Sequence, residues 1–99
     1  MTRAEILDKA KEIVTQARQD QYGSPENNFQ LVADLWTAYI GEVTMPNGAT
    51  ITIDLRPQDV AVMMMLLKIA RIGTGADKED NWVDIAGYAA CGGEVESER

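Results

Sequence analysis

Apolar residues recur at helical spacing over most of this chain, and they predict four helices. The first predicted helix starts at Thr2, where Thr2 and Glu5 match a capping box, and it ends near Gly23. The second follows Ser24 and Pro25, a helix cap and a proline suited to the first helical position. One apolar stripe is expected along this second helix, formed by Phe29, Val32, Ala33, Trp36, Tyr39 and Ile40.

The third and fourth predicted helices are more apolar than the first two. The third runs from Pro57 to about Ile72, residues 73–75 break it, and the fourth follows from Lys78 to about Gly92. The third is apolar almost all round, with three charged exceptions: Asp59, Lys68 and Arg71. A helix that is apolar on all sides needs partners on all sides, and three other helices cannot surround it. We therefore expect a homo-oligomer, either a dimer or a tetramer.

A different pattern separates the second and third helices. Residues 43–54 contain the turn signal Pro46-Asn47-Gly48, followed by polar and apolar residues that alternate from 49 to 54. This pattern predicts a short β-hairpin. The chain is thus expected to form a single all-α domain over residues 1–99, with a hairpin inserted between helices two and three. The polar tail at 94–99 is expected to fray.

Charge and composition narrow the classes of function. Sixteen acidic and nine basic residues give a net charge of −7, which argues against binding to a nucleic acid backbone. The chain has no histidine, which excludes His-based catalysis and His-ligated zinc, and its one cysteine, Cys91, is expected to be a buried inert thiol. The first residues lack an apolar signal region, and the apolar run 60–67 is too short to cross a bilayer. We therefore expect a soluble, cytoplasmic protein without membrane contact.

Two carboxylates in the fourth helix are the strongest candidates for chemistry. Asp80 and Asp84 are four residues apart and so share one face of that helix. Together they can hold Mg²⁺, which prefers oxygen ligands and keeps several of its waters. In the alternative interpretation, Asp80 caps the helix and Asp84 pairs with Lys68 or Arg71.

Other polar residues lie near these carboxylates in the predicted fold. Lys68 and Arg71 share one face near the end of the third helix, where they can bind phosphate oxygens or pair with acids. Asp59 is a third candidate metal ligand, although the helix dipole alone favours an acid in a first turn. The corner at 18–29 contains three polar residues that could contact a nucleobase or a sugar: Tyr22, Asn27 and Asn28. In the alternative interpretation, these residues only form helix caps and turns.

Three strings, at 22–29, 59–71 and 80–88, resemble a family of small phage and prophage proteins without established function. That family is loosely similar to the all-α nucleoside triphosphate pyrophosphohydrolases of the MazG and dimeric dUTPase type, which form dimers or tetramers and hold Mg²⁺ on acidic residues. The resemblance implies that Asp84 and Asp80 are catalytic and bind the metal. It also implies that Lys68 and Arg71 contact phosphates. The Glu-x-x-Glu pair of that superfamily is absent from the second and third helices.

Two functions remain open at this point. One is a phage-type Mg²⁺-dependent pyrophosphohydrolase with a degenerate acidic site, which cleaves a nucleoside triphosphate to the monophosphate and pyrophosphate. The other is a non-catalytic phage accessory protein. Such a protein would sequester a nucleotide, or bind a host protein through an acidic surface, in the host cytoplasm.

Overall fold

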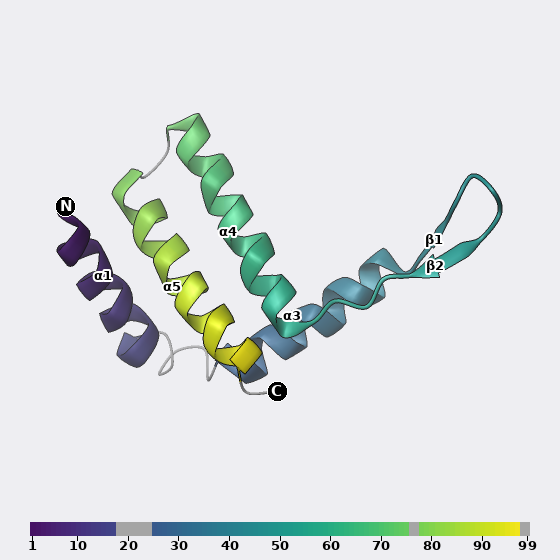
Figure 1. Ribbon diagram of the computed structural model, residues 1–99, viewed down its shortest axis with the longest axis horizontal. Coiled ribbons are helices and arrows are strands. Elements are labelled where there is room, and N and C mark those ends of the chain that lie inside the picture. The colour runs from purple at the N-terminus through teal and green to yellow at the C-terminus, as the bar shows by residue number, and fades with distance from the viewer. Residues whose placement is uncertain (18–24, 76–77, 98–99) are drawn as a thin grey trace.

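The computed structural model describes residues 1–17, 25–75 and 78–97. These residues form four helices and one small antiparallel sheet, which confirms the predicted fold class (Figure 1). The elements in chain order are α1 (Arg3–Glu12), which continues into the π-helical turn η1 (Ile13–Ala17), α3 (Pro25–Ile40), β1 (Glu42–Thr44), β2 (Thr50–Thr52), α4 (Pro57–Thr74) and α5 (Lys78–Ser97). None of the described helices is both long enough and apolar enough to span a membrane.

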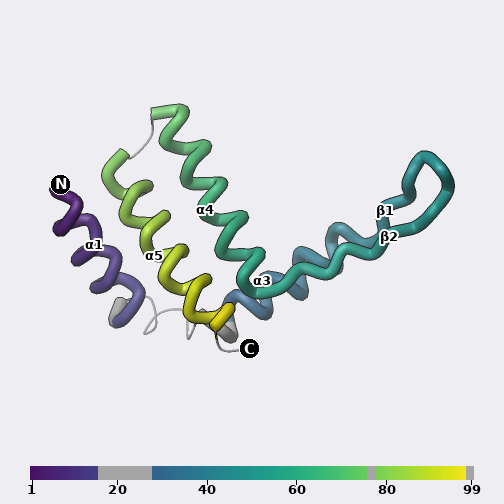
Figure 2. Tube along the Cα trace, in the orientation of Figure 1, coloured from purple at the N-terminus to yellow at the C-terminus, as the bar shows by residue number. Residues whose placement is uncertain are grey.

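Helices α1, α5 and α4 form one layer with α5 in the middle, as Figures 1 and 2 show. Helix α4 runs antiparallel to α5, whereas α1 runs in the same direction as α5. Helix α3 crosses the end of this layer where α4 begins, and it then extends away from the other helices. The two strands lie at the far end of α3, and Val43 pairs with Ile51 at the centre of their three-residue register.

Local hydrogen bonds define the helix ends that the sequence indicates. The backbone N–H of Thr2 donates to Glu5 Oε1 at 3.1 Å, and the N–H of Glu5 donates to Thr2 Oγ1 at 3.2 Å, which confirms the predicted capping box. Helix α4 has Pro57 as its first residue and Thr74 as its last, and Gly75 caps its C-terminal end. The φ of Gly75 is +82°, the left-handed conformation that glycine adopts without steric cost at the end of a helix.

The core lies where α3, α4 and α5 meet. Its buried members are Phe29, Ala33, Val60, Ala61, Tyr88, Cys91 and Val95. Two glycines of α5 allow its neighbours to approach closely. A Cβ atom added at Gly92 would lie 2.6 Å from the Cβ of Ala61 in α4, and one at Gly87 would lie 3.2 Å from Val14 Cγ1 in η1.

Some features differ from the predictions. Helix α5 does not end near Gly92 but continues to Ser97, because Val95 is buried in the core and so holds the last turns in place. The expectation that the tail frays from residue 94 is therefore wrong as far as Ser97. The apolar stripe of α3 is covered only in its first half, and Tyr39 near its end is 92% exposed. The predicted end of the first helix at Gly23 lies outside the described residues.

Candidate functional site

An ion pair between α4 and α5 is the centre of the candidate site. Lys68 Nζ of α4 lies 3.0 Å from Asp84 Oδ2 of α5, and these side chains are 17% and 28% exposed. The structure thus contains one of the two arrangements that the sequence left open for Asp84. In this state the carboxylate is already neutralised by an ammonium group.

Packing alone does not require this ion pair. Lys68 lies on the side of α4 that faces α5, at helical spacing from the core residue Ala61. Removing two charges from water costs free energy, and apolar residues of similar volume at such positions are often as stable or more stable. These two helices also bury the polar residues Gln58 and Asn81, but the ion pair is charged, and it is therefore a candidate for function as well as for structure.

Arg71 and Asp80 extend the charged site toward the connection between α4 and α5. Arg71 lies three residues after Lys68 on α4, and Asp80 lies four residues before Asp84 on α5. Residues at these spacings are neighbours on one helix face, and both Arg71 and Asp80 are exposed. Asp80 is in the first turn of α5, where a carboxylate also interacts favourably with the helix dipole. The fold therefore brings two cations and two carboxylates to the same end of the α4–α5 pair.

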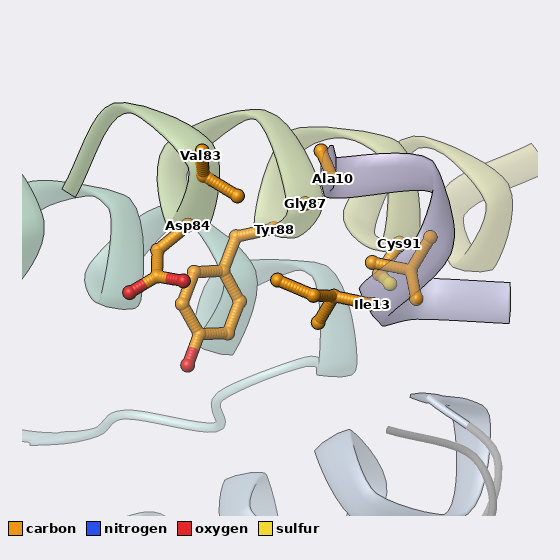
Figure 3. Close-up of a pocket in the computed structure, with 8 residues that line it drawn as sticks. Ala10, Ile13, Val83, Asp84, Gly87, Tyr88 and Cys91 are labelled. Atoms are coloured by element: carbon orange, nitrogen blue, oxygen red, sulfur yellow. The ribbon is translucent and has the colours of Figure 1, made fainter. Parts of the chain in front are cut away.

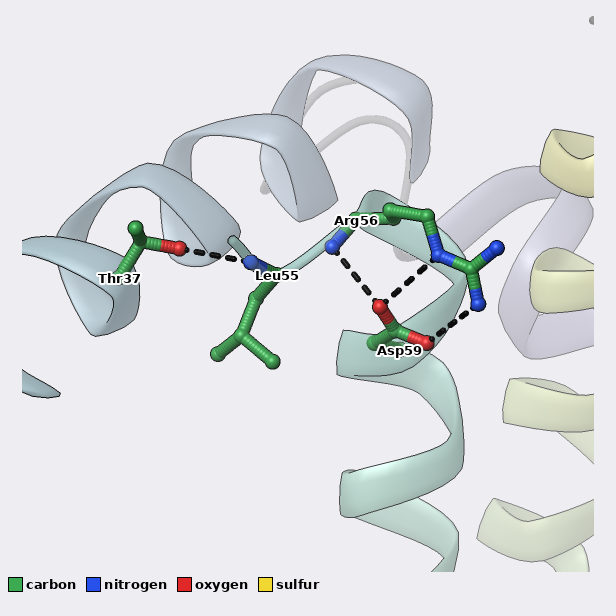
Figure 4. Close-up of polar contacts among 4 residues, drawn as sticks. All are labelled: Thr37, Leu55, Arg56 and Asp59. Carbon is green, nitrogen blue, oxygen red and sulfur yellow. Dashed lines mark hydrogen bonds and ion pairs between the residues drawn. The ribbon is translucent and has the colours of Figure 1, made fainter. Parts of the chain in front are cut away.

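Asp59 does not join this group. Its carboxylate accepts hydrogen bonds from the backbone N–H of Arg56 at 2.9 Å and from the Arg56 side-chain Nε and Nη2 at 3.1 and 3.0 Å (Figure 4). The carboxylate of Asp59 in turn raises the pKa of the Arg56 guanidinium. Lys68 is nine positions after Asp59, which corresponds to about 13.5 Å along α4. The structure therefore separates Asp59 from the other two predicted metal ligands.

The donor set for a metal ion is small. Within the part of the chain that the structure describes, no group of three Asp, Glu, Cys or His side chains could hold a metal ion. Asp80 and Asp84 offer two carboxylates on one helix face, which suits a Mg²⁺ ion that keeps most of its waters. Asp84 is also paired with Lys68, so a cation would have to displace the ammonium group to reach that carboxylate.

The three predicted nucleotide contacts are placed only in part. Tyr22 lies outside the described residues, and so does the side chain of Asn27, whose backbone belongs to the first turn of α3. Asn28 is half-buried and precedes Phe29. The ring centroid of Phe29 is 6.4 Å from that of Tyr88, one turn after Asp84 on α5. The first turns of α3 thus pack against α5 on the C-terminal side of the ion pair.

A cavity of about 10 Å³ lies beside Asp84 (Figure 3). It is lined by Ala10, Ile13, Val14, Val83, Asp84, Gly87, Tyr88 and Cys91. This volume has room for about one water molecule. A nucleotide cannot enter it, so any phosphate would have to reach Lys68 and Arg71 from the exposed side of the site.

Sequence reasoning missed a second hollow at the other end of α4. This groove has a volume of about 320 Å³, and its lining includes Arg56, Gln58, Asp59 and Glu96. Gln58 is buried, and its Nε2 has no hydrogen-bond partner among the described residues. The spacing of Gln58 from Ala61 and Met65 places this polar side chain on the inward face of α4, so the sequence alone could have identified Gln58 as a candidate residue.

Comparisons with known proteins give a family but no solved fold. A family model described as a domain of unknown function, DUF6378, matches residues 5–96. The Gene 55 protein of Mycobacterium phage L5 is 44% identical over 84 residues, which cover 85% of this chain and 47% of that protein. The Gene 55 protein of Mycobacterium phage D29 is 36% identical over 87 residues, which cover 87% of this chain and 50% of that protein. The chain thus spans about half the length of the curated relatives it matches, and no solved structure matches it.

Proposed function

This chain belongs to the family DUF6378, and we propose that it acts on a nucleotide through its charged site between α4 and α5. In this proposal Lys68 and Arg71 bind the phosphates of a nucleoside triphosphate. Asp80 and Asp84 would hold Mg²⁺, and a water molecule would hydrolyse the bond between the α- and β-phosphates to give the monophosphate and pyrophosphate. The observation that carries the proposal is the half-buried Lys68–Asp84 ion pair, a charged contact between α4 and α5.

The ion pair suits an exchange of partners. At rest Lys68 and Asp84 neutralise each other. A triphosphate would give the Lys68 ammonium group a new anionic acceptor, while a cation would take the carboxylate of Asp84. Both charges therefore stay compensated when the ligand binds, and Arg71 adds a planar guanidinium that can bind two phosphate oxygens.

Magnesium would supply the remaining chemistry. When bound, it neutralises polyphosphate charge and makes a coordinated water more acidic. The chain's own residues would bind and orient: Lys68 and Arg71 fix the phosphates, and Asp80 and Asp84 fix the cation. Because the described site offers two carboxylates, we expect weak metal binding that strengthens when nucleotide is present.

A non-catalytic phage accessory protein is the second candidate, and a specific observation favours it. The cavity beside Asp84 admits only about one water, and no described third acid joins Asp80 and Asp84. A site of this kind could hold a nucleotide without cleaving it. The net charge of −7 also suits the binding of a host protein through an acidic surface.

Calorimetric titration with Mg²⁺ and a mixture of nucleoside triphosphates, together with an assay of pyrophosphate release, distinguishes these functions. Asp84→Asn should abolish release, whereas the matched control Asp8→Asn, on an exposed face of α1, should leave it unchanged. The double variant Lys68→Met/Asp84→Leu should keep the fold but lose nucleotide binding. Binding without release would establish sequestration. No binding by the wild-type protein would overturn both nucleotide roles and leave the host-protein role.

A further inference from the structure

Gln58 is the unusual residue of the groove at the start of α4. It is 7% exposed, and its Nε2 is buried without a hydrogen-bond partner among the described residues. A buried amide group of this kind has lost its hydrogen bonds to water and gained none in the fold, which costs stability. The last torsion of a glutamine side chain is soft, so the amide can turn toward a ligand. Gln58 is therefore a donor that a ligand in the groove would satisfy.

The groove has room for such a ligand. Its volume of about 320 Å³ lies within the range of sites that bind small ligands. Helix α5 lines it with Ala89, Gly92 and Gly93, and a Cβ atom added at Gly93 would meet no heavy atom within 4 Å. Val62 and Met65 of α4 provide apolar surface in the same groove. A ligand backbone can therefore approach α5 closely while an apolar side chain contacts α4.

The charges that line the groove favour a cationic ligand. Arg56 Nε and Nη2 both donate to Asp59, so this guanidinium is already engaged (Figure 4). Glu96, in the last turns of α5, is a second carboxylate in the groove. The hydrogen bonds and charge of Asp59, and to a smaller extent the charge of Glu96, raise the pKa of the Arg56 guanidinium. Two carboxylates against one guanidinium suit a basic group and disfavour a phosphate.

We propose that this groove binds a peptide segment of another protein, in which a basic residue is next to an apolar one. A backbone carbonyl of the segment accepts a hydrogen bond from Gln58 Nε2. The apolar side chain contacts Val62 and Met65, and the basic side chain pairs with Glu96. The net charge of −7 favours the approach of a basic partner.

This inference does not rest on the nucleotide role. The groove contains Asp59, which is about 13.5 Å from Lys68 along α4. A nucleotide would bring its phosphates against the carboxylates of Asp59 and Glu96, whereas a basic peptide would neutralise them. Peptide binding in the groove and nucleotide binding at the ion pair are therefore separate events, and each can be measured while the other site is intact.

Selection of peptides from a random heptapeptide library on the immobilised full chain tests the proposal. The selected peptides should be enriched in Lys or Arg next to an apolar residue. Gly93→Leu places a side chain in the groove and should weaken binding of the strongest selected peptide roughly tenfold or more. The matched control is Gly73→Leu, at an exposed glycine of α4 where an added Cβ also meets no heavy atom within 4 Å, and it should change binding less than about twofold. No enrichment of basic peptides, or equal effects of the two variants, would overturn the proposal.

A second measurement tests the role of Gln58. In NMR titrations of the isotope-labelled chain with the strongest selected peptide, the side-chain amide signals of Gln58 should shift. Gln58→Met should weaken binding about fivefold, yet it should unfold at an equal or higher urea concentration than the wild-type protein. Unfolding at a lower urea concentration would show that the amide of Gln58 serves the fold, and it would contradict the proposal. Displacement of the peptide by a nucleoside triphosphate would assign the groove to the nucleotide site and would also overturn it.

Discussion

Replacing Gly92 with alanine should cost stability at the closest approach of α4 and α5. The new Cβ would lie 2.6 Å from the Cβ of Ala61, whereas carbon atoms in contact ordinarily lie about 3.5–4.0 Å apart. Because Ala61 belongs to a buried helix segment, relief requires the two helices to move apart. Overpacking of this kind costs about 1–3 kcal/mol. Alanine also gains about 1 kcal/mol over glycine in a helix interior, so the net loss should be about 0–2 kcal/mol.

The neighbouring Gly93 provides a matched control for this variant. It lies in the same helix, is exposed, and an added Cβ would meet no heavy atom within 4 Å. Gly93→Ala should therefore gain about 1 kcal/mol from helix propensity alone. The difference between the two variants isolates the overlap and should be about 1–3 kcal/mol.

Urea unfolding measures this difference, with all proteins at one concentration because self-association changes apparent stability. Thermal unfolding should show it as a difference of roughly 4–8 °C for each kcal/mol. If Gly92→Ala proves as stable as Gly93→Ala, then α4 and α5 do not approach as closely as described. The reasoning that glycine is required at residue 92 would then be refuted.

Three further predictions concern the caps and the ion pair. Thr2→Ala should lose about 0.5–2 kcal/mol in urea unfolding, because it removes the side chain that caps α1. Hydrogen bonds from Thr2 lower the pKa of Glu5. The carboxylate of Glu5 therefore stabilises the fold at pH values above its ordinary pKa of 4.5, and this stabilisation is lost as the pH falls through the lowered pKa. If Glu5→Gln has the same pH dependence of stability as the wild-type protein, this assignment is wrong. Asp84→Ala should lower the free energy of unfolding by about 1–3 kcal/mol, which is less than the loss expected for a fully buried ion pair. The double variant Lys68→Met/Asp84→Leu should regain most of this stability, because it leaves no unpaired charge. A double variant as unstable as Asp84→Ala would exclude the desolvation of Lys68 as the cause.

Features of the fold that depend on local sequence were predictable. The capping box of Thr2 and Glu5 and the turn at 46–48 involve residues a few positions apart, so their sequence signals were sufficient. The end of α5 was not predictable in this way. Polar residues after Gly92 favoured fraying, but the burial of Val95 against distant parts of the chain keeps the helix intact to Ser97.

The candidate site was predictable in its components but not in its pairing. Helical spacing placed Asp80 with Asp84 and Lys68 with Arg71, but it could not decide whether Asp84 faces a metal ion or Lys68. That outcome depends on how α4 and α5 align, which is set by contacts such as Gly92 against Ala61. Asp59 is a different case, since Arg56 three residues earlier provided a local signal for an ion pair.

The two sides of α4 have different surroundings. Its inward side packs against α5 and contains Lys68, which is neutralised by Asp84. Its outward side is largely exposed, and Leu66 there is 59% exposed. Leu66 and Lys68 lie on opposite sides of α4, so the losses of unfolding free energy in Asp84→Asn and in Leu66→Glu should be additive. Strong coupling, measured by urea unfolding of the double variant, would mean that the two sides of α4 are not separate.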